Sequence, residues 1–274
     1  MRISVSNIAW DRRDDLAVAE LLVKQEIDAI DVAPGKYFDD FATASDEDIN
    51  NVRCWWMDRG IEIVGMQALL FGTQGLNLFG EPSVRKRMLT YLGHVCRIAR
   101  GLGARFLVFG SPRNRDRSGL DDQSTADIAI DFFRRLGEIA ADQDAVICLE
   151  PNPPIYGSNF MTDSLVTAQV VRAVDHPAIR MQFDVGALTL NGEDAAVVLA
   201  DVADLIAHIH ASEPELKVLG DCGTDHGPIS SAIRTLCPDK IVTIEMREDA
   251  HAPLICLERA LAFAQRWYGP VEGS

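Results

Sequence analysis

The sequence predicts one α/β domain in which eight strands and eight helices alternate in a closed (β/α)8 TIM barrel. Short apolar runs alternate with segments of helical periodicity along the whole chain, which indicates βα units and a parallel sheet. The ends of these runs recur roughly every 25 to 45 residues, as they do in a barrel. The 274 residues contain no linker or low-complexity segment that would divide them. A doubly wound open sheet is the alternative, but no G-x-G-x-x-G motif follows the first strand.

The first half of the chain supplies four of the expected βα units. Asp14 and Asp15 suit the N-terminus of the first helix, and the second begins near Ser45. The third helix, about 82–102, has a proline near its first turn, and the fourth is expected to open at Ser124. A long loop rich in glycine and phenylalanine follows the third strand and is a candidate lid or pocket wall. The expected strands are 2–7, 29–33, 61–67 and 106–110.

The second half repeats the pattern four more times. Thr162 is the expected N-cap of the fifth helix, and a short helix is expected near 195–199. Pro228 marks the start of a helix that reaches about Leu236, and a last helix covers about 254–267. The expected strands are 146–150, 181–185, 205–210 and 241–245. One domain is therefore expected over residues 1–274, with a polar tail at about 269–274.

Composition excludes several classes of function. A net charge of -15 argues against nucleic-acid binding, which requires basic surfaces. No apolar run approaches the roughly 18 residues that span a bilayer, and the N-terminus does not resemble a signal peptide. The six cysteines form no C-x-x-C pair, and several lie in apolar runs, as reduced cysteines do. We expect a cytoplasmic protein without membrane or nucleic-acid partners.

The fifth expected strand ends in an unusual way. Four apolar residues, 146–149, run directly into Glu150, and the prolines that follow prevent further strand pairing or helix. An ionisable carboxylate at the end of a buried strand is costly unless it is paired. Glu150 is either a metal ligand or base at the open end of a barrel, or a surface residue where the strand leaves the core.

The following three strands end in the same way. Asp184, His210 and Glu245 terminate apolar runs, and polar residues at strand ends converge at one end of a barrel. Packed carboxylates repel one another unless a cation lies among them. Three oxygen donors and one imidazole suit one divalent ion such as Mn²⁺, Mg²⁺ or Co²⁺, whereas Zn²⁺ usually takes fewer carboxylates. The sequence therefore predicts a metal site at Glu150, Asp184, His210 and Glu245.

Several short motifs resemble a known family. The segments LEPNPP, FDVG, HIHASEP and IEMR, with SNIAW and IDVAP near the N-terminus, are similar to the motifs of xylose isomerase-like barrels. The resemblance is greatest to the sugar isomerase and epimerase branch, which includes D-tagatose 3-epimerase-like and hydroxypyruvate isomerase-like enzymes. It implies that Glu150, Asp184, His210 and Glu245 bind one metal, and that Glu150 and Glu245 exchange protons with the substrate carbon.

The chemistry of such a reaction suits this arrangement. Removing a proton beside a carbonyl requires stabilisation of the developing enediolate oxygen, which a chelating metal supplies. Epimerisation also needs one base on each face of the carbon, and Glu150 and Glu245 lie on strands separated by two others. The expected activity is isomerisation or epimerisation of a small sugar, keto-sugar or polyol derivative. A metal-dependent dehydratase similar to inosose dehydratase, and a sugar-binding barrel without turnover, are the alternatives.

The chain departs from the epimerase pattern at two positions. A histidine usually follows the strand-six aspartate as D-x-G-H, whereas this sequence has Ala187. A second glutamate usually lies about six residues after the strand-five ligand, whereas this sequence has Tyr156. Both differences remove polar groups around the reacting carbons, so the resemblance does not fix the sugar.

Other polar residues near the strand ends are candidate supporting groups. His208 lies two residues before His210 and should point the same way one layer deeper, as Gln182 does relative to Asp184. We expect His208 to support the site by hydrogen bonding, and Arg247 either to hold substrate or to pair with Glu213. The candidate substrate contacts are Gln67, Tyr156, Gln182, Ser212, Glu213 and Arg247.

The loops contain further residues that could contact the substrate, but each could equally have a purely structural role. Lys36, Arg113 and Arg115 could hold an anionic group, although isolated basic residues are more often solvated. His226 either closes over the site or belongs to a helix-entry turn. Three aromatic residues could wall the pocket or pack in the core or between subunits of a homodimer or homotetramer: Trp10, Phe38 and Phe71.

Overall fold

The computed structural model forms a closed barrel of eight parallel strands, as the sequence predicts. The structure describes residues 1–248 and 251–270. Each strand pairs with its neighbours in sequence order, and β1 pairs with β8 to close the barrel. The strands are β1 Ile3–Ser6, β2 Ala29–Val32, β3 Glu62–Met66, β4 Phe106–Phe109, β5 Val146–Leu149, β6 Ile179–Asp184, β7 Ile206–Ser212 and β8 Val242–Glu245.

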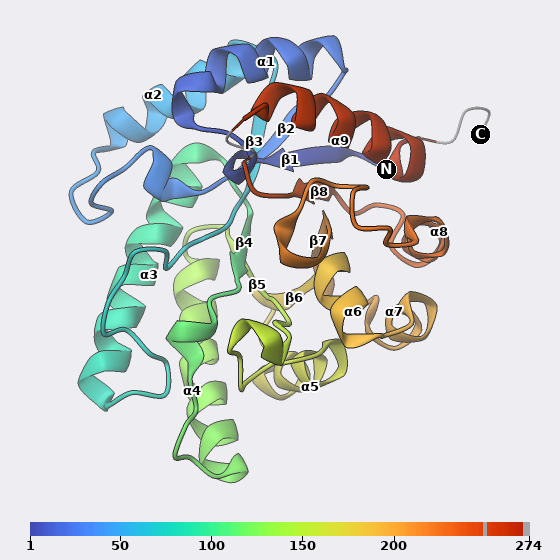
Figure 1. Cartoon of the computed structure of the whole chain (residues 1–274). Coiled ribbons are helices and arrows are strands. Elements are labelled where there is room, and N and C mark those ends of the chain that lie inside the picture. The colour runs from blue at the N-terminus through green and yellow to red at the C-terminus, as the bar shows by residue number, and fades with distance from the viewer. Residues whose placement is uncertain (249–250, 271–274) are drawn as a thin grey trace.

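Helices surround the strands on the outside of the barrel (Figure 1). Apolar residues of the strands and of the inward helix faces form one large core between these two layers. The helices of the described residues are α1 Asp15–Lys24, α2 Asp46–Met57, α3 Pro82–Leu102, α4 Asp122–Ala141, α5 Ser164–Val174, α6 Val185–Asn191, α7 Ala195–Val202, α8 His226–Leu236 and α9 Pro253–Tyr268. None of these helices is long and apolar enough to cross a membrane.

Local sequence signals explain where the helices begin. Ser45 and Asp48 form a capping box at the start of α2, and Pro82 occupies the first turn of α3. Gly103 ends α3 in the left-handed conformation, with φ of 84°, which costs a glycine little.

Several expected boundaries are wrong by one or two residues. The N-cap of α4 is Asp121, which accepts a hydrogen bond from Ser124 N, so the helix begins at Asp122 rather than at Ser124. The N-cap of α5 is Asp163 rather than Thr162, because the Asp163 carboxylate accepts from Val166 N at 2.8 Å. In each case a carboxylate lies closer to the first free N–H groups than the hydroxyl residue that we expected.

The largest difference lies after β6, where no helix was expected before residue 195. The chain instead enters α6 directly from the strand, and Asp184 is its N-cap. Helix α8 likewise begins at His226, two residues before Pro228. At the C-terminus α9 ends at Tyr268, and residues 271–274 of the expected polar tail lie outside the described residues.

The interior of the barrel is polar on one side and apolar on the other. Phe106 of β4 stacks on His208 of β7 across the barrel, with ring centroids 5.3 Å apart. Val108 and Cys148 form a small apolar cluster beside them. Besides His208, buried polar side chains from other strands lie in the barrel interior: Ser4, Asp31, Gln182 and Thr243. This layer is the floor on which the strand-end residues lie.

Candidate active site

The four strand-end residues converge at one end of the barrel. Glu150 follows β5, Asp184 ends β6, His210 lies in β7 and Glu245 ends β8. Each offers one ligand atom, and these atoms all lie within 4.8 Å of one another. His210 Nδ1 is the central atom: it lies 3.5 Å from Glu150 Oε1, 3.8 Å from Asp184 Oδ2 and 3.3 Å from Glu245 Oε2. Parallel strands bring together residues that are far apart in the sequence because all of these strands end at the same rim.

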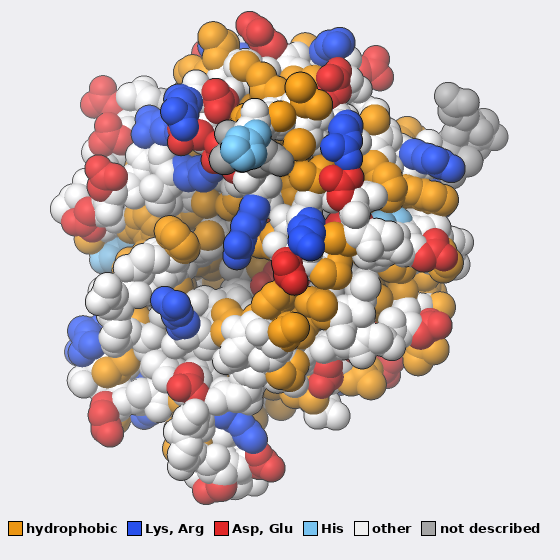
Figure 2. Space-filling model, in the orientation of Figure 1, with side chains coloured by type: hydrophobic (Ala, Val, Ile, Leu, Met, Phe, Trp, Pro, Cys, Tyr) orange, Lys and Arg blue, Asp and Glu red, His pale blue; other side chains and the backbone are white. Residues whose placement is uncertain are grey.

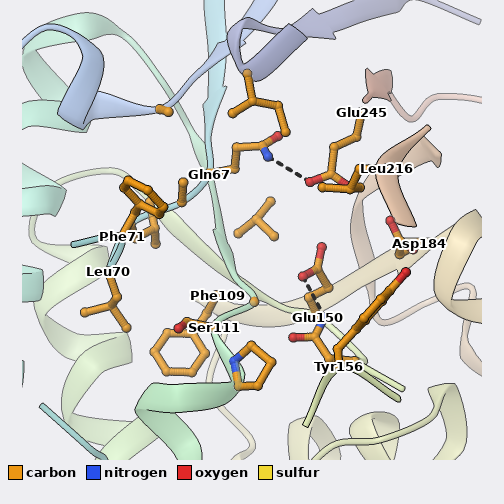
Figure 3. Close-up of a pocket in the computed structure, with 18 of the residues that line it drawn as sticks. Gln67, Leu70, Phe71, Phe109, Ser111, Glu150, Tyr156, Asp184, Leu216 and Glu245 are labelled. Carbon is orange, nitrogen blue, oxygen red and sulfur yellow. Dashed lines mark hydrogen bonds between the residues drawn. The ribbon is translucent and has the colours of Figure 1, made fainter. Parts of the chain in front are cut away.

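Each glutamate is held by an amide through its second oxygen. Gln67 Nε2 donates to Glu245 Oε1 at 2.8 Å (Figure 3). Asn152 Nδ2 donates to Glu150 Oε2 at 3.0 Å. The other oxygen of each glutamate faces His210. Each carboxylate therefore has one oxygen held by an amide and one oxygen directed at His210, which fixes its position at the rim.

Asp184 has two structural partners in addition to its neighbours in the cluster. Its Oδ1 accepts from Ala187 N at 2.6 Å and so caps α6, while its Oδ2 accepts from Ser212 Oγ at 2.8 Å. Ser212 Oγ also accepts from Gly186 N at 2.9 Å. The side chain of Ser212 is fully buried behind Asp184. Its contacts position Asp184, whereas we expected it to meet the substrate.

A second buried group supports His210 from below. Asp31 Oδ2 lies 2.6 Å from His208 Nε2 and 3.8 Å from His210 Nε2. Thr243 Oγ1 lies 3.1 Å from His208 Nε2. A carboxylate behind a histidine fixes the ring and makes its other nitrogen a better metal ligand. Asp31 was not among the residues predicted from the sequence; the signal was an aspartate inside the apolar strand run 29–33.

The cluster carries more negative charge than its neighbours compensate. Burial, with the charges of Glu245 and Glu150, raises the pKa of Asp184 to about 8. Burial acts to lower the pKa of His210, but Glu245 and hydrogen bonds to the surrounding carboxylates raise it well above its usual value. Burial acts to raise the pKa of Glu245, but His210 and the Gln67 amide lower it.

These charges and donors fit a divalent cation. Three buried carboxylates and one imidazole form an oxygen-rich donor set, which suits Mn²⁺, Mg²⁺ or Co²⁺ better than Zn²⁺. A divalent ion among the three carboxylates would offset most of their mutual repulsion. Asp31, His208 and His210 also come within the same distance of one another, but this second group is fully buried beneath the rim.

A cavity of about 710 Å³ opens above the cluster. It is the hollow near the centre of the face shown in Figure 2, with basic and apolar side chains beside it. Glu150, Asp184 and Glu245 line its floor. The loop after β3 lines one wall, as expected of a glycine- and phenylalanine-rich segment in this place. This volume lies within the range of about 300–1,000 Å³ that is usual for small-molecule sites.

The model of one protein family matches residues 19–266, with the description xylose isomerase-like TIM barrel. This chain belongs to that family. The match covers nearly the whole chain, from within α1 to within α9. No curated protein is significantly similar to the chain in sequence.

Several solved structures have the same xylose isomerase-like fold. One is D-psicose 3-epimerase with D-tagatose from Clostridium cellulolyticum H10, with a TM-score of 0.82 and 16% identity, covering 98% of this chain and 100% of that one. Another is the apo form of the 3-keto-D-glucoside 4-epimerase YcjR from E. coli, with a TM-score of 0.79 and 17% identity, covering 97% and 99%. L-ribulose 3-epimerase has a TM-score of 0.79 and 15% identity, covering 97% and 94%. At these identities the likeness shows the fold.

The cavity of this xylose isomerase-like barrel includes some of the expected substrate contacts and leaves others buried. Gln67, Tyr156, Glu213 and Arg247 line it. Gln182 is fully buried beneath it. With the amide turned so that both of its ends are satisfied, its nitrogen donates to His208 O at 3.3 Å and its oxygen accepts from His210 N at 3.1 Å. Gln182 therefore supports the strand of the histidines rather than facing the cavity.

Besides Gln67, which donates to Glu245, two of these lining residues already have partners within the protein. Glu213 accepts hydrogen bonds from Gly220 N and Thr224 Oγ1, and its Oε1 lies 3.2 Å from His226 Nε2. His226 is buried at the start of α8, as expected for a helix-entry residue, and also contacts Tyr268. The Tyr156 hydroxyl accepts from Glu215 N at 2.8 Å. Arg247 is exposed at the rim of the cavity.

The basic loop residues do not form an anion site. Arg115 is fully buried and donates to Glu150 O at 2.8 Å and to Asn152 Oδ1 at 2.6 Å, so it holds the segment after β5 in place. Lys36 Nζ donates to the backbone carbonyls of Asn7 and Trp10. Arg113 is exposed. The expectation for Arg115 as a solvated or anion-binding residue is wrong, because its guanidinium is used by the protein itself.

The three candidate wall aromatics separate into two groups. Trp10 and Phe38 are buried and belong to the core. Phe71 lines the cavity and is 87% exposed.

Gly110, directly after β4, also lines the cavity, and a Cβ at this position would overlap Glu150 Oε2. The glycine thus leaves room for the Glu150 carboxylate, which would have to move if a larger residue stood here.

Proposed function

We propose that the protein is a divalent-metal-dependent isomerase or epimerase of a small sugar, keto-sugar or polyol derivative. The observation that carries this proposal is that Glu150 and Glu245, from two different strand ends, each present one oxygen to His210 Nδ1 while an amide fixes the other oxygen. A site that only bound a sugar or a metal would have no need for two carboxylates arranged in this way.

A divalent ion held by Glu150, Asp184, His210 and Glu245 would supply Lewis-acid stabilisation of the oxygens beside the reacting carbon. Glu245 or Glu150, as an ionised carboxylate, accepts the proton from that carbon. The other glutamate, protonated at the start of the turnover, donates its proton to the opposite face, so that the two groups exchange protonation states. Gln67 and Asn152 keep the carboxylates oriented through this exchange. Asp184 and His210 would serve only to hold the ion.

The substrate class is supported by the comparisons. Structures with this fold include enzymes named for D-psicose, L-ribulose and 3-keto-D-glucosides, which all carry a carbonyl beside hydroxyl-bearing carbons. We propose Mn²⁺, Mg²⁺ or Co²⁺ as the metal, because these ions prefer oxygen donors. The thiols of Cys54 and Cys222 are exposed, which supports a reducing, cytoplasmic location. A homodimer or homotetramer stays a prediction.

Solvent exchange tests the proposed reaction even when the product is unidentified. Candidate ketoses and keto-sugars are incubated with the protein and Mn²⁺ in D₂O, and deuterium on carbon is measured by NMR. We expect incorporation next to the carbonyl, and we expect Glu245→Gln and Glu150→Gln each to abolish it while the fold is retained. Glu138→Gln, at an exposed position of α4, is the matched control and should have no effect.

The outcome also separates the proposal from its alternatives. Loss of water from the substrate, seen as a new dehydrated product, would assign the protein as a dehydratase with the same metal site. A sugar that raises the melting temperature but never exchanges its hydrogen would assign it as a binding protein.

A further inference from the structure

The cavity above the carboxylate cluster has two chemically different sides. Its floor is lined by the carboxylates of Glu150, Asp184 and Glu245. Figure 3 shows Leu70 and Phe71 across the cavity from Asp184 and Glu245. The apolar wall, as we call this side, consists of Leu69, Leu70 and Phe71 of the loop after β3; Phe41, Phe109 and Pro112 also line the cavity. Sugar hydroxyls need polar partners, so the floor suits a sugar unit and the apolar wall does not.

Phe71 is the one member of the apolar wall that projects from it. Its side chain is 87% exposed, whereas the adjacent Leu69 and Leu70 are 2% and 4% exposed. Single exposed apolar side chains are common on protein surfaces, but this ring is part of the cavity lining and lies next to buried apolar residues. The ring thus offers area that a ligand in the cavity would cover.

The loop that carries Phe71 is held in place. Asn114 is buried, and its Nδ2 donates to Thr73 Oγ1 at 3.2 Å and to Leu76 O at 2.8 Å. Phe71 N donates to Ala68 O at 3.0 Å, and Ala68, which also lines the cavity, has a φ of 53°. A non-glycine residue keeps this left-handed conformation only where its surroundings impose it. The apolar wall is therefore preformed.

The charges of the cavity do not suit a phosphate opposite the carboxylates. Among the described residues that line it, the cationic ones are Lys36 and Arg247. Lys36 donates to the carbonyls of Asn7 and Trp10. A neutral, apolar group is the ligand part that matches the apolar wall.

We propose that the substrate is a glycoside-like molecule whose sugar unit lies on the carboxylate floor and whose aryl-sized apolar substituent packs against Phe71 and Leu70. The volume of about 710 Å³ accommodates both parts. The assignment of the sugar unit to the floor rests on the proposed function. The assignment of the substituent to the apolar wall rests on Phe71 and its neighbours.

The experiment compares ligands that differ only in the substituent. Calorimetry with the Mn²⁺-loaded full chain measures Kd for the methyl and phenyl β-glycosides of D-glucose and of its 3-keto form. We expect the phenyl glycoside of at least one pair to bind about 10-fold tighter or more, since burying two apolar ring faces contributes that much. Phe71→Ala should remove this preference and change the Kd of the methyl glycoside by no more than about twofold.

Two further variants act as controls. Phe71→Leu should retain most of the preference because it keeps an apolar side chain. Ile155→Ala removes an exposed apolar side chain, 73% exposed, that does not line the cavity, and should change neither affinity. Equal affinities for the two glycosides, no binding of the phenyl glycosides at millimolar concentration, or a Phe71→Ala effect on oligomeric state alone would overturn the inference.

Failure of the inference and failure of the proposed function give different results. If free and phenyl-substituted sugars both exchange deuterium but the phenyl glycosides bind no more tightly, the apolar subsite is contradicted and the proposed reaction still stands. If the phenyl glycosides bind more tightly in a way that depends on Phe71, but no ligand incorporates deuterium, the proposed reaction is contradicted and the apolar subsite still stands.

Discussion

The carboxylate of Asp31 lies 2.6 Å from Nε2 of His208, and both side chains are fully buried. The same carboxylate is 3.8 Å from Nε2 of His210, whose Nδ1 faces the three strand-end carboxylates. Burial acts to raise the pKa of Asp31, but His208 and His210 lower it, so the residue stays ionised beneath the site. Asp31 thus pairs with His208 and lies at ion-pair distance behind His210, the histidine that the proposed metal site depends on.

Replacing Asp31 tests this arrangement. Asp31→Asn should weaken Mn²⁺ binding about 10- to 100-fold, the usual effect of losing a carboxylate behind a ligating histidine. Calorimetric titration of the metal-free protein measures the change. Asp28→Asn is the matched control, because Asp28 lies one residue before β2 in an exposed ion pair with Arg2 and should leave the affinity unchanged. Unaltered metal binding in Asp31→Asn would show that His210 is oriented without it.

Gly110 gives a second way to disturb the site without touching a ligand. A Cβ in Gly110→Ala would overlap Glu150 Oε2, so the carboxylate must turn away from Asn152 and from His210. We expect weaker Mn²⁺ binding and loss of deuterium exchange with the fold retained, as judged by circular dichroism.

Gly93→Ala is the corresponding control. Gly93 lies within α3, and a Cβ there would have Ile139 Cγ2 as its nearest neighbour outside the helix backbone at 3.7 Å, an ordinary contact. The variant should stabilise the protein by about 0.5–1 kcal/mol, since alanine loses less backbone entropy than glycine in a helix. Chemical denaturation measures this. Equal metal affinity in the two alanine variants would contradict the role of Gly110.

Asp184 combines a structural and a proposed ligand role, and two substitutions separate them. Asn caps a helix about as well as Asp, so Asp184→Asn should keep α6 while weakening metal binding. Asp184→Ala loses the cap as well, and its metal-free form should be about 1 kcal/mol less stable than that of Asp184→Asn. Denaturation of the metal-free proteins compares the two. A metal affinity equal to that of the parent in Asp184→Asn would remove this residue from the ligand set.

Metal binding should depend on pH because protons and the metal compete for the same groups. In the metal-free protein the pKa of Asp184 is raised to about 8, so this carboxyl holds a proton at neutral pH. The pKa of His210 is raised well above its usual value, so the imidazole keeps its proton to higher pH than a free histidine does. The metal must displace these protons, and its apparent affinity should therefore rise with pH up to about pH 8. Calorimetry in buffers with different ionisation enthalpies counts the protons released. An affinity that is constant between about pH 6 and about pH 8 would contradict this.

Much of the fold could be predicted from the sequence because the signals are local. Apolar strand runs and capping residues act over a few neighbouring positions, and Glu150, Asp184, His210 and Glu245 could be selected because each ends such a run. Helix α6 was not predicted. Its N-cap is Asp184, which we interpreted only as the end of a strand and a metal ligand, although aspartate is also a common N-cap residue.

The supporting contacts could not be predicted, because each joins residues that are distant in the sequence. Asp31 meets His208 across 177 positions, and Gln67 meets Glu245 across 178. Arg115 is buried against the backbone of Glu150, although its sequence neighbourhood is that of a solvated loop. The sequence by itself determined the barrel and the four residues at its rim, through local periodicity. Only the tertiary structure decided which groups hold those residues and which face the cavity, because closure of the barrel sets these distances.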